Sequence, residues 1–230
     1  FFSFKGLMLY LLTLVFVKSL HELGHAFVSK YFGCRVSSIG IAFLVFFPFL
    51  YTDTSDAWRL RDHKDRLLIN FAGILTELHL ALISTFLWAI LPDGGLKSVA
   101  FFIATTSWIS SLAINVSPFM RFDGYYVFSD WLKAENLQPR SFALARWQLR
   151  EILFGFNHSP PEDLNPSRRW TFISYAWLTW VYRFFIFLGI ALLVYHLAFK
   201  TLGIILFVIE IYWFILRPII TETKNWYNLK

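Results

Sequence analysis

The sequence predicts an all-α, multi-pass membrane protein with about five spanning helices and one short re-entrant segment. Two observations predict this fold class. The 230 residues are 57% hydrophobic and only 16% charged, whereas soluble domains carry about 25% charged residues. The charged residues also cluster between long apolar runs instead of along one exposed face. The net charge of +6 is therefore typical of the connections between spans, and no nucleic-acid partner is expected.

Five apolar runs are long enough for bilayer-spanning helices, which need about 20 residues each. They cover residues 4–30, 67–91, 98–119, 170–197 and 202–220. Only the turn sequence Pro92-Asp93-Gly94-Gly95 separates the second run from the third, so these two helices should form an antiparallel pair. A link of similar length, residues 196–201, joins the last two runs.

The apolar stretch at residues 39–51 is too short to cross a bilayer as a helix. It contains Gly40 and Pro48, and β-branched side chains recur in and before it, namely Val36, Ile39, Ile41 and Val45. This composition favours a re-entrant pair of strands. A buried loop packed on the helices is the alternative.

The connection at residues 125–169 contains an amphipathic pattern between Pro139 and Gly155. Apolar residues recur there at helical spacing among Arg140, Arg146 and Arg150. The pattern predicts a helix at the membrane surface that ends at Gly155, or one that packs on a domain outside this stretch. Because the chain opens on an apolar run without an initiator methionine, we expect a segment of a longer protein with room for additional domains.

The distribution of Lys and Arg predicts the orientation of the spans. Residues 30–66, 120–169 and 217–230 hold sixteen of these 21 basic residues. The opposite side has only Lys5, Lys97 and Lys200. Because short cytoplasmic connections carry the excess of basic residues, the long connections should lie in the cytosol.

The first span carries four ionisable residues on one helical face. Lys18, His21, Glu22 and His25 have the spacing i, i+3, i+4 and i+7. His21, Glu22 and His25 form an H-E-x-x-H motif, in which two histidines one turn apart can bind Zn²⁺ and the glutamate can act as a general base. Ionisable groups in an apolar helix need compensation, and a metal supplies it. Histidines that hydrogen-bond to neighbouring helices are the alternative.

The third apolar run ends in a second motif, Asn115-Val116-Ser117-Pro118-Phe119-Met120-Arg121-Phe122-Asp123-Gly124. An H-E-x-G-H helix followed by N-x-x-P-x-x-x-x-D-G at the cytosolic end of another helix resembles the site-2 protease family of intramembrane zinc metalloproteases. The resemblance covers about 125 residues, the first three spans and the stretch between the first two. Both motif-bearing spans run from outside to inside, so the two motifs can meet.

The resemblance implies roles for several of these residues. Asp123 would be the third zinc ligand, and Asn115, Pro118 and Gly124 would shape the end of that helix. The stretch at 35–52 would form a hairpin beside the active site, where it could hold an unwound substrate as an added strand.

Two departures from the family pattern indicate a divergent branch. Met120 stands where the family often has a second proline. In the second span, Glu77 replaces an asparagine, and its helical face points it into the bundle at about the depth of the zinc. Its role stays open among substrate binding, proton transfer, metal binding and a structural hydrogen bond. Lys18 could reach lipid headgroups, pair with a carboxylate such as Glu77, or stabilise an oxyanion.

Arg183 and Glu210 fall near the middle of the last two spans. Because these helices should be antiparallel neighbours, the simplest interpretation is a mutual ion pair with a structural role.

The expected protein is a single membrane domain over residues 1–230, with a core at 4–124 and two further spans at 170–220. We expect one Zn²⁺ per chain, held by His21, His25 and Asp123, with Glu22 as catalytic base. The substrate would be a membrane-embedded protein or peptide, cut near the cytosolic side of a bacterial cell membrane, with water arriving along the second and third spans. The alternative function is a metal-binding component of a membrane assembly or transporter without proteolysis.

Overall fold

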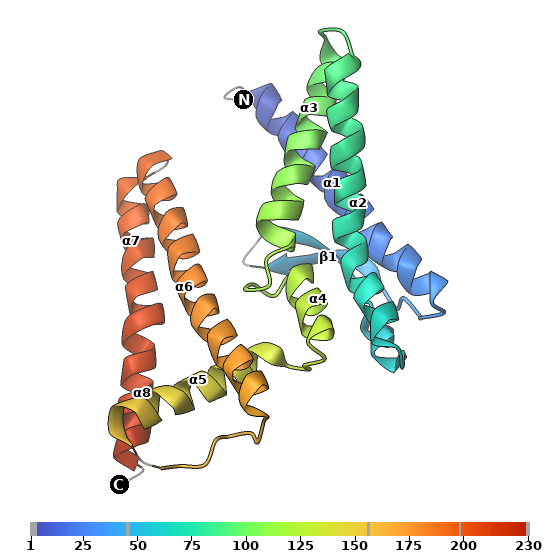
Figure 1. Ribbon diagram of the computed structural model, residues 1–230. Coiled ribbons are helices and arrows are strands. Elements are labelled where there is room, and N and C mark those ends of the chain that lie inside the picture. The colour runs from blue at the N-terminus through green and yellow to red at the C-terminus, as the bar shows by residue number, and fades with distance from the viewer. Residues whose placement is uncertain (1–3, 45–46, 156, 198, 229–230) are drawn as a thin grey trace. The chain divides into compact units, whose positions relative to one another are not determined.

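The computed structural model describes residues 4–44, 47–155, 157–197 and 199–228 (Figure 1). The chain divides into two compact units, Phe1–Glu135 and Asn136–Lys230, which are described separately. The predicted core at residues 4–124 falls inside the first unit. The single domain over the whole chain stays a prediction.

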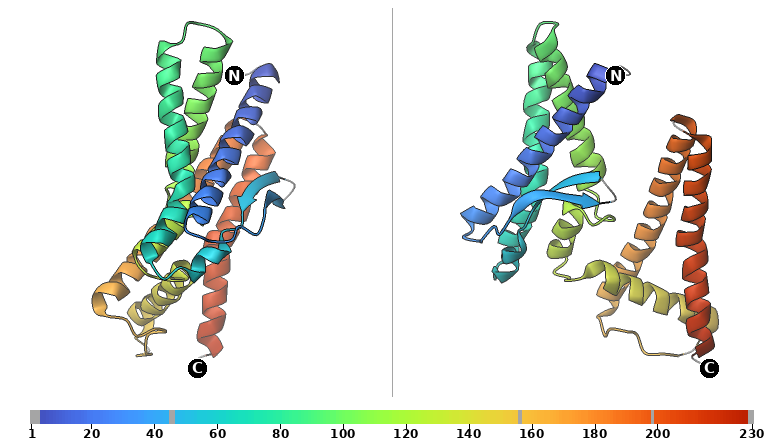
Figure 2. Two further views of the ribbon diagram at one scale, coloured as in Figure 1. Left: turned by 90° about the vertical axis from the view of Figure 1, so that its right-hand side faces the viewer. Right: turned by 180° about the vertical axis from the view of Figure 1, so that it is seen from behind.

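The three longest helices of the first unit are α1 (Phe4–Tyr31), α2 (His63–Ile90) and α3 (Gly95–Trp108). Each contacts the other two, and Figure 2 shows α2 and α3 as a hairpin that α1 crosses. The long helices are apolar and free of proline inside, and α2 begins where the Asp62 side chain accepts a hydrogen bond from the Lys64 amide. The antiparallel pair predicted from the turn at residues 92–95 is confirmed.

The third predicted span is helical but changes its hydrogen-bond pattern. The α-helix α3 has 14 residues, and it continues as a π-helical segment, η2 (Ile109–Asn115), of 7 residues. Within the described part of the chain, four helices are long and apolar enough to cross a membrane, those at residues 8–31, 63–90, 166–196 and 200–224. These four helices coincide with four of the predicted spans, whereas α3 alone is too short. The count of five spans, and spanning by α3 with η2, stay predictions.

A two-stranded antiparallel hairpin follows α1, with strands β1 (Ile39–Leu44) and β2 (Phe47–Thr52). The predicted strand pair is therefore confirmed, although Val45 lies outside the described residues. The base of the hairpin is fixed to α1 because the Thr52 hydroxyl donates to the Glu22 carbonyl at 3.0 Å. Re-entry of the hairpin into a membrane stays a prediction.

The second unit contains the helices α5 (Leu137–Phe154), α6 (Pro166–Leu197) and α7 (Lys200–Glu210). Helix α7 continues through the π-helical segment η3 (Ile211–Leu216) into α8 (Arg217–Asn228). The predicted amphipathic helix is confirmed as α5, and it ends at Gly155. The φ angle of Gly155 is 59°, a left-handed conformation that glycine adopts without strain because it has no Cβ atom. Its position at a membrane surface stays a prediction.

The predicted ion pair between Arg183 and Glu210 is wrong. The Arg183 guanidinium lies over the Phe142 ring, 5.9 Å from its centroid. Oε2 of Glu210 is buried and has no hydrogen-bond partner among the described residues. The prediction failed because neighbouring helices at matching depth can still present these side chains to different sides.

Candidate metal centre

Helix α1 places two buried histidines side by side, one turn apart. The rings of His21 and His25 meet edge to face, with centroids 4.9 Å apart, and their Nε2 atoms lie 3.3 Å from each other. Nδ1 of His25 lies 2.8 Å from the carbonyl oxygen of Ile69 in α2. Since a carbonyl can only accept, Nδ1 of His25 carries the proton and Nε2 presents its lone pair.

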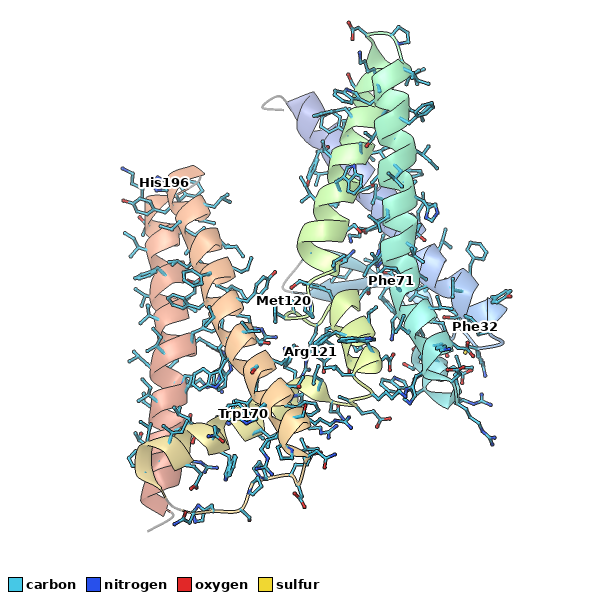
Figure 3. The ribbon with its side chains drawn as sticks, in the orientation of Figure 1. Phe32, Phe71, Met120, Arg121, Trp170 and His196 are labelled. Carbon is cyan, nitrogen blue, oxygen red and sulfur yellow. The ribbon has the colours of Figure 1, made fainter. Side chains whose placement is uncertain are left out.

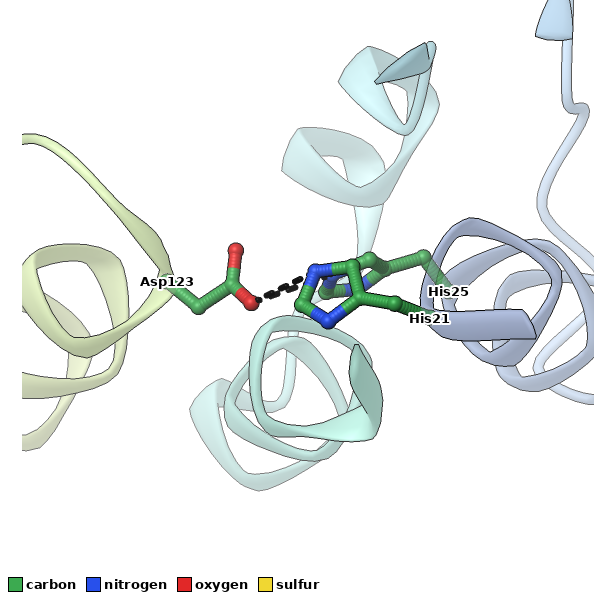
Figure 4. Close-up of side chains that lie close together, drawn as sticks. All are labelled: His21, His25 and Asp123. Carbon is green, nitrogen blue, oxygen red and sulfur yellow. Dashed lines mark hydrogen bonds and ion pairs between the residues drawn. The ribbon is translucent and has the colours of Figure 1, made fainter. Parts of the chain in front are cut away.

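Asp123 reaches both histidines from a different part of the chain (Figure 4). It is the first residue of a short helix, α4 (Asp123–Trp131), which was not predicted from the sequence. Oδ2 of Asp123 lies 3.0 Å from Nε2 of His21 and 3.4 Å from Nε2 of His25. The predicted meeting of the two motifs is thus seen in the first unit.

The three atoms fit a zinc site. Two Nε2 atoms and Oδ2 form a triangle with edges of 3.0, 3.3 and 3.4 Å, and ligand atoms around tetrahedral Zn²⁺ lie about 3.3–3.4 Å apart. Oδ2 of Asp123 is buried and makes no well-formed hydrogen bond among the described residues. A buried carboxylate oxygen without such a bond is costly. The donor set of two imidazoles and one carboxylate is one that zinc accepts.

Helix α2 passes against the two rings at Gly73, which leaves the space for them. A Cβ atom at this position would collide with Cε1 and Nε2 of His21 and with Nε2 of His25. The backbone of α2 therefore approaches the donor atoms more closely than any larger residue would allow.

The second motif also has a packing role. The turn that carries Met120 and Arg121 leads from η2 into α4 (Figure 3). A Cβ at Gly124 would collide with the backbone of Asn115 and Val116. Gly124 thus lets the start of α4 rest on the end of η2, and Pro118 lies in the turn between them.

Glu77 is fully buried beside the histidines but lies outside the triangle of donor atoms. Its Oε1 accepts a hydrogen bond from Nζ of Lys18 at 2.7 Å, and its Oε2 accepts one from Nδ2 of Asn115 at 3.0 Å. Of the roles left open by the sequence, pairing of Lys18 with Glu77 is therefore confirmed. The position of Glu77 in the interior at the depth of the histidines is also confirmed.

A polar cavity of about 550 Å³ lies beside the donor residues. Glu22, His25 and Asp123 line its inner wall, and the other lining residues are Ser38, just before β1, and residues of β2, of the segment 53–58, of the start of α2, and of α4. Helix α3 contributes none of the described lining residues. The expected water path along the second and third spans is thus only partly right. Residues of α2 line the cavity as expected, but β2 and α4 form its other walls in place of α3.

Sequence reasoning missed the contact that attaches α4 to α2. Nδ2 of Asn70 donates to Oδ2 of Asp130 at 2.7 Å, and Nη2 of Arg66 lies 3.5 Å from Oδ1 of the same carboxylate. Asp130 and Arg66 are buried. The only signal for this contact in the sequence was that Arg66 and Asn70 are polar and lie one turn apart at the start of the second span. This spacing did not indicate that Asp130 is their partner.

Comparison with known families agrees with this geometry. Residues 8–114 match the model of Peptidase family M50, the site-2 protease family. Over these residues the chain is similar to the site-2 protease family. The matched residues include the H-E-x-x-H helix, the hairpin and the α2–α3 pair, so the resemblance seen in the sequence is confirmed. The same comparisons give no significant match among curated proteins or solved structures.

The family match ends just before Asn115. Asp123 therefore joins the candidate metal centre through its contacts with the histidines and not through the matched residues. Members of the family are zinc-dependent membrane metallopeptidases, which agrees with the donor atoms and with the four span-capable helices.

Proposed function

We propose that this chain is an intramembrane zinc metalloprotease that hydrolyses a peptide bond within or next to a membrane-embedded segment. The observation that carries the proposal is the convergence of three donor atoms beside a polar cavity that Glu22 lines together with His25 and Asp123, two of the three donor residues. A metal-binding scaffold would need the donors alone. A glutamate next to the first histidine and open to solvent supports catalysis instead.

The residues of the chain divide the chemistry between them. His21, His25 and Asp123 would hold Zn²⁺, which when bound polarises the scissile carbonyl and lowers the pKa of water. Glu22 would accept a proton from the attacking water in the cavity and later deliver it to the leaving amine. Asn115, Pro118 and Gly124 would hold the turn that presents Asp123.

The hairpin supports a mode of substrate binding. Leu50, Tyr51 and Thr52 of β2 line the same cavity as Glu22. A substrate segment that pairs with β2 as an added strand would therefore pass beside Glu22 with its backbone extended. Because proteases act on extended chains, a helical membrane segment would have to unwind before it binds.

The proposed orientation follows from the basic residues, sixteen of which flank the spans on the side of Asp123. By the positive-inside rule this side is cytosolic. The family resemblance favours a bacterial cell membrane, and the proposed partners are a membrane protein or peptide and the surrounding lipid.

The proposal is tested in cells that express either the parent chain or Glu22→Gln at equal levels. We expect new protein N-termini within or beside membrane segments only with the parent, while purified samples of both hold about one zinc per chain. A comparable set of new N-termini with Glu22→Gln would exclude Glu22 as the base. Zinc in both samples without new N-termini in either would favour the non-proteolytic metal-binding component.

A further inference from the structure

Glu77 is a carboxylate in the interior of the first unit, with no exposed surface. An uncompensated charge there would cost several kcal/mol. Two donors compensate it on two sides, the Lys18 ammonium at 2.7 Å from Oε1 and the Asn115 amide at 3.0 Å from Oε2. The cluster joins α1, α2 and η2, so the carboxylate occupies one defined position.

Oε1 of Glu77 also lies 3.0 Å from Nδ1 of His21. The distance is within hydrogen-bonding range, and Nδ1 is buried with no hydrogen-bond partner elsewhere among the described residues. The opposite nitrogen of the same ring, Nε2, faces Asp123 at 3.0 Å. The His21 ring therefore lies between two carboxylates, one on each nitrogen.

The two histidines have different partners on their outer nitrogens. His25 uses the backbone carbonyl of Ile69, which is neutral and comes with any residue at that position. His21 depends on a side chain that a single substitution can remove. A carboxylate on the outer nitrogen of a metal-binding histidine sets the ring orientation and raises its basicity, and the loss of such a partner weakens metal binding about 10–100-fold.

We propose that Glu77 is a positioning residue whose carboxylate faces the Nδ1–H group of His21, keeps the proton on Nδ1 and so directs the Nε2 lone pair of His21 into the donor triangle. This inference rests on the proposed function, because it assumes that the triangle holds zinc. It assigns a purpose to the glutamate that distinguishes this chain from the family pattern. Lys18 and Asn115 then serve to hold the Glu77 carboxylate in place.

The test is zinc affinity in the detergent-purified full chain, measured by competition with a coloured chelator. Glu77→Gln keeps the shape of the side chain but removes its charge, and we expect zinc to bind about 10–100-fold more weakly. Glu77→Asp keeps the negative charge but shortens the side chain by one methylene and withdraws the oxygen that faces both Lys18 and His21, so a smaller loss is expected. If Glu77→Gln does not fold, Glu77→Asp carries the test.

Glu210→Gln is the matched control, because Glu210 is also a buried carboxylate but lies on α7 in the other unit. Its zinc affinity should equal that of the parent. Visible absorption of Co²⁺-loaded protein provides a second measurement, and we expect the band to change in the Glu77 variants and not in Glu210→Gln. A merely structural Glu77 would lower thermal stability without changing this band.

The two proposals fail in distinguishable ways. Zinc affinity within twofold of the parent in folded Glu77→Gln or Glu77→Asp would overturn the role of Glu77 and leave the metal site intact. Failure of the parent itself to bind zinc would overturn the proposed function, and the role of Glu77 with it.

Discussion

Oδ2 of Asp123 lies 3.0 Å from Nε2 of His21, although the hairpin, α2 and α3 separate the two residues along the chain. The H-E-x-x-H helix supplies only two of the three donor atoms, and the third comes from Asp123, about 100 residues further along the chain. Their contact depends on the packing of α1 and α2 and on the turn that leads from η2 into α4. It is also the contact on which the metal site depends most directly.

Replacing Asp123 with Ala should reduce zinc from about one per chain to a small fraction of that value. The reason is that two imidazoles alone bind zinc much more weakly than three protein ligands. Metal analysis of the purified protein by mass spectrometry measures this. Asp93→Ala is the control, since Asp93 is exposed and pairs only with Lys97 across one helical turn among the described contacts, and it should keep its zinc. Full zinc in Asp123→Ala would mean that another carboxylate is the ligand.

Gly73→Ala should both destabilise the protein and weaken zinc binding. The added Cβ would collide with both imidazole rings, so either α2 or the donor atoms must move. Overpacking of this kind costs about 1–3 kcal/mol. Thermal unfolding with and without zinc measures both effects. Gly189→Ala in α6 meets no atom within 4 Å and should leave stability and zinc binding unharmed. Unchanged zinc binding in Gly73→Ala would show that α2 does not confine the rings.

Asn70→Ala should loosen the attachment of α4 to α2. Loss of the 2.7 Å hydrogen bond to Asp130 leaves a buried carboxylate short of a donor, at a cost of about 1–3 kcal/mol. Because α4 begins with Asp123, we also expect zinc to bind several-fold more weakly in a chelator competition.

Thr85→Ala is the comparison for Asn70→Ala, because it removes a hydrogen bond from Trp108 at the other end of α2. It should lower the unfolding temperature without changing zinc affinity. Equal zinc affinities in the two variants would contradict a role for the Asn70–Asp130 contact in placing Asp123.

The ion pair of Glu162 should stabilise the second unit at neutral pH, and this stabilisation should be lost in acid. The Arg140 guanidinium beside Glu162 holds the pKa of that carboxyl below its ordinary value. The stabilisation is therefore complete above the ordinary pKa, about 4.3, and is lost as the pH falls through the lowered pKa. Since both side chains are about one-third exposed, it should amount to less than about 1 kcal/mol.

The measurement for Glu162 is the difference in unfolding temperature between parent and Glu162→Gln from pH 7 to pH 3. This difference should be largest at neutral pH and shrink as the pH falls. A difference that stays constant over this range would show that the charge of Glu162 does not stabilise the unit.

The sequence by itself determined what is local. The helical repeat places His21, Glu22 and His25 on one face whatever surrounds them, and length and hydropathy delimit the helices at residues 63–90 and 166–196. The hairpin at residues 39–52 was likewise predictable, because β-branched residues and a length too short for a spanning helix both act over a few residues.

The tertiary structure alone decided which distant groups meet. The pairing of Glu77 with Lys18 and Asn115, the anchoring of α4 through Asn70, and the absence of an Arg183–Glu210 pair all depend on the rotation of one helix against another. A helical pattern specifies which residues share a face but not which face of a neighbour it meets. That choice follows from the summed packing of many side chains, such as the close approach at Gly73, which no single motif contains.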